Sequence, residues 1–158
     1  MKAGTRLIVT TAVATLALVA GRASAAEDCQ GSPGDGAVKL TVATSNLRSA
    51  EGEVAVTVYP DDSKRFLAKG GKLARVRTPA AQPTTRACFW LPPGTYAVAV
   101  YHDENGDGAF DRSIVGAPKE GYGFSNDAPA NMGLPDFAAV RFKLPAGGRT
   151  ISVHMRYP

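Results

Sequence analysis

Acidic and amide side chains recur at alternate positions in one short stretch near the middle of the chain. Asp103, Asn105 and Asp107 are spaced by two, Gly108 follows them, and Asp111 lies four residues beyond Asp107. Calcium takes six to eight oxygen ligands, and side chains spaced by two along a turning backbone converge on one centre. The D-x-N-x-D-G pattern therefore predicts a calcium-binding loop over residues 103–111.

The predicted ligand set combines this loop with one residue from the segment that follows it. The expected donors are the side chains of Asp103, Asn105, Asp107, Asp111 and Glu120 and the backbone carbonyl of Ala109. Asp127 is a second candidate for the outlying carboxylate. Ile114 stands where a helical calcium hand places a bidentate glutamate, so a weak affinity of roughly 0.1–1 mM is expected. The alternative interpretation is a solvated hairpin tip, because Asp, Asn and Gly are all good turn formers.

The N-terminal residues have the pattern of an export signal. Lys2 and Arg6 precede an uncharged, largely apolar run from Leu7 to Ala20, and Ala23-Ser24-Ala25 forms a cleavage site. We expect residues 1–25 to be removed and residues 26–158 to form one domain that is periplasmic or secreted. The apolar run is shorter than the roughly 20 residues that cross a bilayer, and no transmembrane segment is expected after cleavage.

Loss of the leader nearly neutralises the chain. The whole sequence has 18 basic and 14 acidic residues, for a net charge of +4, but Lys2, Arg6 and Arg22 lie in the leader. The remaining 15 basic and 14 acidic residues give +1. Such a balance does not favour a nucleic-acid partner.

Two cysteines, Cys29 and Cys88, remain after the leader. Disulfides persist in exported proteins, and neither cysteine has a second cysteine or a histidine at close ligand spacing. We expect the two to form one disulfide bond that ties the N-terminus to a strand in mid-domain.

Short alternating segments separated by glycine and proline indicate an all-β fold. We expect residues 38–42 and 54–58 to form a hairpin, residues 73–78 and 84–91 to form a second pair, and residues 96–101 to lead into the acidic loop. Alternation over residues 138–144 and 151–157 predicts two last strands joined by a turn. About seven strands at this spacing predict an antiparallel β-sandwich of immunoglobulin-like or transthyretin-like shape.

Three segments resemble an exported bacterial family catalogued as domain of unknown function 2141. They are residues 91–98 with the sequence L-P-P-G-T-Y-A-V, residues 102–105 with H-D-E-N, and residues 116–126 with the pattern G-x-P-x-E-G-x-G-F-S-N. The closing strands match the family as well. The resemblance extends over essentially the whole mature chain. It implies an exported protein and no particular activity.

The end of the third segment offers a second candidate site. Tyr122, Phe124, Ser125 and Asn126 combine aromatic rings with hydroxyl and amide groups of the kind that recognise carbohydrates or small ligands. The alternative is an ordered loop whose aromatic rings cover the sandwich core.

An enzymatic interpretation is the weakest. Ser125, His102 and Asp103 could be assembled into a hydrolase triad, but no G-x-S-x-G elbow is present. His102 could alternatively act with Glu120 or Asp103 in acid–base chemistry. We expect a binding or structural module and no enzyme.

Positive charge is concentrated in residues 63–102, which contain seven basic residues and no Asp or Glu. They are Lys64, Arg65, Lys69, Lys72, Arg75, Arg77 and Arg86. This window could attract an anionic envelope glycan or another envelope protein, and a solvated strand surface is the alternative. Aromatic residues do not alternate with the basic ones as a nucleic-acid platform requires.

Overall fold

The computed structural model describes residues 28–131 and 134–158, and the predicted signal peptide lies outside them. The described chain consists of short strands with one 3₁₀ turn and one helical turn. The strands are β1 (Val38–Ser45), β2 (Glu53–Pro60), β3 (Ala74–Pro79), β4 (Thr84–Leu91), β5 (Gly94–Asp103), β6 (Gly121–Phe124), β7 (Ala130–Asn131), β8 (Leu134–Pro135), β9 (Phe142–Leu144) and β10 (Arg149–His154). The turns are η1 (Ser125–Asp127) and α1 (Phe137–Val140).

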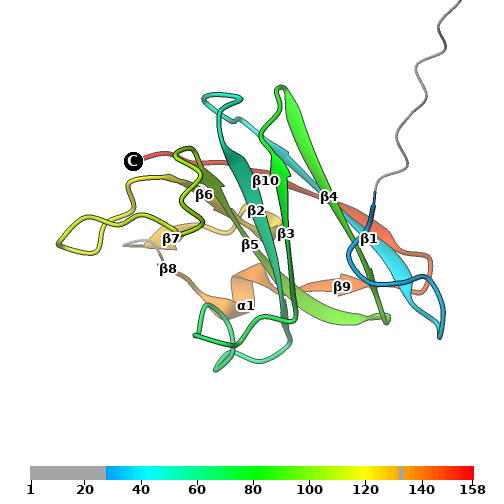
Figure 1. Cartoon of the computed structure of the whole chain (residues 1–158). Helices are drawn as coiled ribbons and strands as arrows, with labels where there is room; N and C mark the ends of the chain where they lie inside the picture. Colours follow the sequence, from blue (N-terminus) through cyan, green and yellow to red (C-terminus); the bar gives the residue numbers. More distant parts are fainter. Residues whose placement is uncertain (1–27, 132–133) are drawn as a thin grey trace, which may run out of the picture.

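Two sheets face each other across one main core (Figure 1). The first has the order β10-β1-β4, and the second has the order β3-β2-β5-β6, with β9 paired to the start of β5. Side chains alternate across a strand, so Leu40 and Val42 of β1 enter the same core as Val56 of β2 and Val98 of β5. The predicted all-β sandwich is confirmed.

The strand pairings differ from those predicted. Residues 38–42 and 54–58 do not form a hairpin, because β1 pairs with β4 and β10 whereas β2 pairs with β3 and β5. Residues 73–78 and 84–91 likewise lie in different sheets. Alternation identifies the buried face of a strand, and strands from either sheet of a sandwich show the same alternation. The connection from Asn46 to Gly52 crosses between the sheets and buries Leu47.

The two predicted last strands, β9 and β10, are present and joined by a turn, but the first begins at Phe142 and not at Ala138. Residues 137–140 form α1, whose first turn is capped by Asp136 accepting a hydrogen bond from the Ala138 amide at 3.0 Å. β9 joins β5 in one sheet, and β10 joins β1 in the other. The β1–β10 pair is parallel, so the sandwich is not purely antiparallel.

The predicted disulfide between Cys29 and Cys88 is present. Cys88 is buried in β4. Next to the disulfide, the backbone amide of Gln30 donates a hydrogen bond to the Cys88 carbonyl at 3.0 Å. The bond therefore fixes the N-terminal segment against the first sheet. No helix in the described part of the chain is long and apolar enough to cross a membrane.

The two sheets come together beside β6. The amide of Tyr122 donates to the Arg156 carbonyl at 2.9 Å, and the Arg156 amide donates back to the Tyr122 carbonyl at 2.8 Å. Such a close approach needs small residues in β6. A Cβ atom at Gly121 would lie 2.3 Å from the Tyr157 ring, and one at Gly123 would lie 2.6 Å from Val153 Cγ1. The glycines of the G-x-G-F-S-N segment therefore have a packing role.

Replacing Gly123 by alanine should lower the free energy of unfolding by about 1–3 kcal/mol, because the added methyl overlaps Val153 and the His154 carbonyl. Urea unfolding of the variant measures this. Gly147→Ala is the matched control, since a Cβ there meets no atom within 4 Å, and it should change stability by less than about 0.5 kcal/mol. Equal effects of the two substitutions would contradict the packing role.

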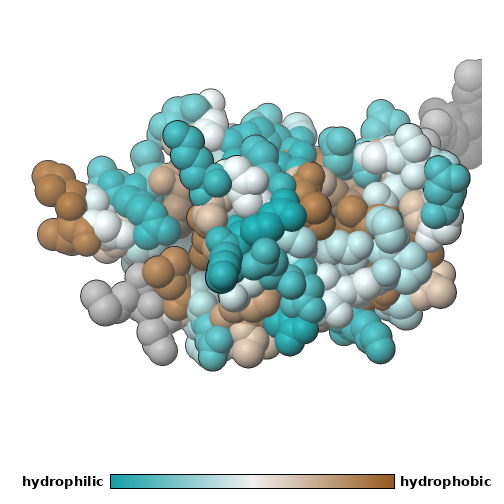
Figure 2. All heavy atoms as spheres, turned by 90° about the horizontal axis from the view of Figure 1, so that it is seen from below, coloured by the Kyte–Doolittle hydropathy of each residue, from teal (hydrophilic) through white to brown (hydrophobic). Residues whose placement is uncertain are grey.

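The segment between β5 and β6 projects from one end of the molecule (Figure 1). Its outer half is a hairpin in which the Ser113 amide donates to the Ala117 carbonyl at 2.8 Å. Ile114 and Val115 at its tip are exposed, and Figure 2 shows hydrophobic residues protruding at this end. Ile114 therefore lies at the solvent-exposed tip of this hairpin.

Candidate functional site

β5 places the first acidic residue in the protein interior. Asp103 is the last residue of β5 and its side chain is fully buried. Its Oδ2 atom accepts hydrogen bonds from Arg77 Nη1 and from the Gly108 amide, both at 2.9 Å. The strand end and the loop are thereby joined through one carboxylate oxygen.

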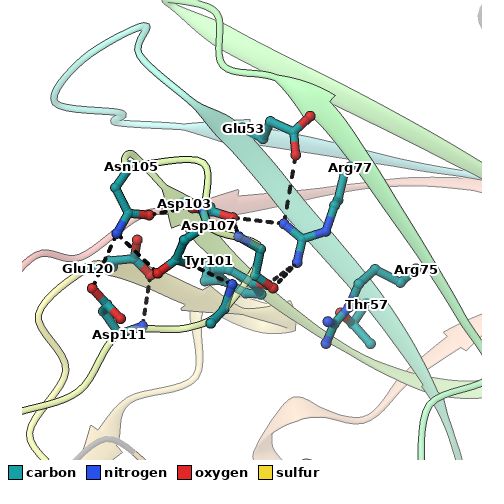
Figure 3. A network of polar contacts seen from close by, with 12 residues as sticks. Glu53, Thr57, Arg75, Arg77, Tyr101, Asp103, Asn105, Asp107, Asp111 and Glu120 are labelled. Atoms are coloured by element: carbon teal, nitrogen blue, oxygen red, sulfur yellow. Dashed lines mark hydrogen bonds and ion pairs between the residues drawn. The ribbon is translucent and has the colours of Figure 1, made fainter.

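Arg77 reaches this carboxylate from a strand that is not adjacent to β5. In register, Arg77 of β3 lies opposite Ala55 of β2, which in turn lies opposite Tyr101 of β5. The small Ala55 side chain lets the guanidinium pass over β2 and contact the Tyr101 hydroxyl and the Gly108 carbonyl (Figure 3). Glu53 Oε2 lies 3.8 Å from the same guanidinium. The sequence pattern did not indicate Arg77 as part of the loop, although the acid-free basic window contains it.

Some polar groups of the loop form hydrogen bonds with one another. Asn105 Oδ1 accepts from the Asp107 amide at 3.1 Å, and Asp107 Oδ1 accepts from the Ala109 amide at 2.8 Å. Gly108 adopts a φ of +82°, in the left-handed region that glycine favours. These are the hydrogen bonds of consecutive Asx turns, which the alternative interpretation of a solvated turn also requires.

The remaining carboxylates converge on the Asn105 amide nitrogen. Asn105 Nδ2 lies 3.2 Å from Asp107 Oδ2 and 3.4 Å from Asp111 Oδ2 (Figure 3). Glu120 immediately precedes β6, and its Oε2 accepts a hydrogen bond from the Asp111 amide at 3.0 Å. The structure therefore brings Asp103, Asn105, Asp107, Asp111 and Glu120 into one hydrogen-bonded network. Ala109 belongs to the same loop, and its amide donates to Asp107 Oδ1.

Two carboxylate oxygens of this network are buried without a hydrogen-bond partner. They are Asp103 Oδ1 and Glu120 Oε1, on side chains that are 0% and 5% exposed. Burial raises the pKa of the Glu120 carboxyl, and the nearby Asp103 and Asp111 carboxylates add to that rise. As the loop stands, no group of three or more His, Cys, Asp and Glu side chains in the described residues is arranged to hold a metal ion.

Glu104, although it belongs to the same stretch, faces away from the network. Its Oε1 accepts from Arg48 Nε at 2.9 Å and from Ser49 Oγ at 3.1 Å. The hydrogen bonds from Arg48 hold the pKa of the Glu104 carboxyl below its usual range. Asp127, the second candidate for the outlying carboxylate, instead contacts His154, with Oδ2 2.6 Å from Nδ1.

The four residues of the second predicted site separate into two pairs. Tyr122 and Phe124 line a pocket on the outer face of the second sheet. Ser125 Oγ is buried, accepts from the Val98 amide at 2.9 Å and contacts the Val140 carbonyl. Asn126 Nδ2 donates to the carbonyls of Ala139 and Arg141 at 2.9 and 2.8 Å. Ser125 and Asn126 therefore hold α1 against β5.

His102 is fully buried and both of its ring nitrogens are occupied. Nδ1 lies 2.7 Å from the Tyr157 hydroxyl, and Nε2 lies 2.8 Å from the Glu51 carbonyl oxygen. A carbonyl only accepts, so Nε2 carries the proton. The ring nitrogens of His102 thus contact neither Glu120 nor Asp103, the two acid–base partners considered for it, and His102 ties the loop before β2 to the C-terminus.

Comparison with known proteins gives one family. A family model described as an uncharacterized protein conserved in bacteria (DUF2141) matches residues 42–152. The match covers the core strands, the acidic network and the pocket. No curated protein and no solved structure matches the chain.

Proposed function

The chain belongs to the bacterial family domain of unknown function 2141, whose description names no activity, and we propose from the acidic network that it is an exported module that binds calcium. The proposed ligands are the side chains of Asp103, Asn105, Asp107, Asp111 and Glu120 and the backbone carbonyl of Ala109. The module is proposed to act by binding and not by catalysis.

The observation that carries this proposal is the pair of unpaired buried oxygens, Asp103 Oδ1 and Glu120 Oε1. Leaving a buried carboxylate oxygen without a donor is costly, and such oxygens mark a place for a cation or a donor. Arg77 satisfies Oδ2 of Asp103 but contacts neither of the two unpaired atoms. Calcium is a hard cation that prefers carboxylate, amide and carbonyl oxygens.

The Asn105 side chain shows what calcium binding requires of the loop. Its amide nitrogen lies between the carboxylates of Asp107 and Asp111, where a donor offsets their negative charge. Rotating the terminal amide by half a turn would present Oδ1 to the same carboxylates and release the Asp107 amide. This rearrangement and the absence of a bidentate glutamate at Ile114 support an affinity of roughly 0.1–1 mM.

Thermal unfolding of the mature, oxidised protein tests the proposal. The melting temperature is measured in chelator and then in calcium up to several millimolar. A ligand at ten times its Kd stabilises the native state by about 1.4 kcal/mol, so a saturable rise of a few degrees is expected. Glu120→Gln should lose the rise. Glu104→Gln changes the net charge equally but faces Arg48, so it should keep the rise.

Failure of the parent protein to respond to calcium would overturn the proposal. So would an unchanged response in Glu120→Gln. Either result would favour a structural envelope component in which residues 103–111 form only a turn stabilised by Arg77.

Without calcium, Glu120→Gln should be more stable than the parent at neutral pH, by about 1 kcal/mol. Glu120 has a raised pKa, so its ionised form costs the folded state free energy at any pH above that value. As the pH falls through the raised pKa toward the ordinary glutamate value, the parent binds its proton and the difference should shrink. Melting in chelator across this range measures the effect. A variant less stable than the parent at neutral pH would contradict this account of Glu120.

The structure offers no support for the hydrolase alternative. His102 has no free ring nitrogen, and Ser125 Oγ is used by the backbone of β5 and α1. A hydrolase screen in which His102→Ala removes an activity would overturn the proposal that the module is not an enzyme.

A further inference from the structure

A pocket lies on the outer face of the second sheet, between the acidic loop and the segment that joins β2 to β3. Its volume is about 250 Å³. Thr57 of β2 and Tyr101 of β5 form part of its lining, Phe110 comes from the acidic loop, and Tyr122 and Phe124 come from β6. The described residues that line it include no Asp, Glu, Asn or Gln.

Aromatic rings form a continuous tract along this pocket. The ring centroids are 5.5 Å apart for Tyr101 and Phe110, 6.3 Å for Phe110 and Tyr122, and 5.9 Å for Tyr122 and Phe124. All three pairs are tilted or edge-on, arrangements in which one ring fixes the orientation of the next. The apolar lining therefore presents both ring faces and ring edges to a ligand.

Two arginines add positive charge to the lining. Arg75 Nε donates to Thr57 Oγ1 at 2.7 Å, and its guanidinium carbon lies 5.6 Å from the Tyr101 ring centroid (Figure 3). Arg112 Nη1 donates to the Gly116 carbonyl at 3.0 Å, with its guanidinium carbon 4.9 Å from the Phe110 ring. Neither arginine forms an ion pair with any residue that the structure describes. The pocket thus combines an apolar lining with two cations that have no acidic partner among the described residues.

We propose that this pocket binds a small aromatic carboxylate. Guanidinium groups pair with carboxylates through two parallel hydrogen bonds, and the rings offer faces and edges to an aromatic ligand. A cavity of roughly 150 Å³ can hold benzene, so the present volume suits one ring with a polar substituent. A neutral sugar fits less well, because the described part of the lining has none of the carboxylate and amide side chains that usually bind its hydroxyls.

The proposal does not rest on calcium binding. Phe110 and Tyr101 are shared with the acidic loop, since the Tyr101 hydroxyl contacts the Gly108 carbonyl at 3.2 Å. Ligand titrations are therefore run both in chelator and in calcium. Binding in either condition supports the pocket, so that failure of the calcium site and failure of the pocket can be told apart.

Isothermal titration with 4-hydroxybenzoate is the test, with 4-hydroxybenzamide as the uncharged analogue and galacturonate as the acidic sugar. We expect saturable binding of 4-hydroxybenzoate and at least about tenfold weaker binding of the other two. Arg75→Gln should weaken the binding of 4-hydroxybenzoate about tenfold, and Tyr122→Ala should weaken it as well. Arg86→Gln is the matched control, because Arg86 is exposed on β4 in the other sheet, and it should bind like the parent.

Any of four results would overturn the proposal: no saturation by 4-hydroxybenzoate up to about 10 mM in either condition, equal binding of the amide, tighter binding of galacturonate, or equal effects of Arg75→Gln and Arg86→Gln. Circular dichroism melting of each variant shows whether it is folded. If Arg75→Gln is unfolded, Arg112→Gln takes its place with the same expected loss.

Discussion

Replacing both Cys29 and Cys88 by serine should lower the free energy of unfolding by about 4 kcal/mol, the largest effect expected of any substitution considered. The two cysteines are 59 residues apart, and their bond closes a loop that contains β1, β2 and β3. Opening this loop increases the conformational freedom of the unfolded chain, so the unfolded state is favoured. Urea unfolding of the oxidised parent and the double variant measures the difference.

The reduced parent is the control for this prediction. It lacks the bond but keeps both sulfur atoms, so it should unfold at the same urea concentration as the double serine variant. A double variant within about 1 kcal/mol of the oxidised parent would show that the bond contributes little.

Asp103→Ala should cost about 3 kcal/mol when measured in chelator. The substitution removes a fully buried carboxylate, leaves Arg77 with only the more distant carboxylate of Glu53 at 3.8 Å, and frees the Gly108 amide. Removing one member of a partly buried ion pair is destabilising because the charge of the other member is then compensated less well. Chemical denaturation gives the free energy directly.

Asp107→Ala is the matched control, since Asp107 is an exposed aspartate of the same loop whose partners in the described part of the chain are Asn105 and the Ala109 amide. Its replacement should cost less than about 1 kcal/mol. Similar losses for the two variants would mean that Asp103 has no special part in holding the loop to the strands.

The sequence was sufficient to predict the sandwich because burial on one face of a strand leaves a period of two. Val54, Val56 and Val58 show it, as do Leu40 and Val42, and all five enter the same core. Which strands pair was not predictable, since strands from both sheets carry that period. The helical turn at residues 137–140 was missed because Ala138 and Val140 continue the alternation of Phe142 and Leu144.

The candidate site was predictable only where its residues are close in sequence. The spacing of Asp103, Asn105, Asp107 and Asp111 predicts a loop in which they meet, and the structure brings them together with Glu120. Arg77 could not be assigned, because its contact with Asp103 depends on the order β3-β2-β5 and on a small residue at Ala55. The sequence indicated only that Arg77 and Arg75 belong to a basic stretch, residues 63–102, that has no acidic residue.

The most direct test of calcium binding by residues 103–111 is a nuclear magnetic resonance titration of the ¹⁵N-labelled, oxidised protein with calcium. Calcium binding predicts saturable shifts of the amide signals of Gly106, Gly108 and Asp111 at millimolar calcium, and these shifts should disappear in Glu120→Gln and persist in Glu104→Gln. Shifts that magnesium reproduces equally, that persist in Glu120→Gln, or that never saturate would contradict a calcium site in this loop.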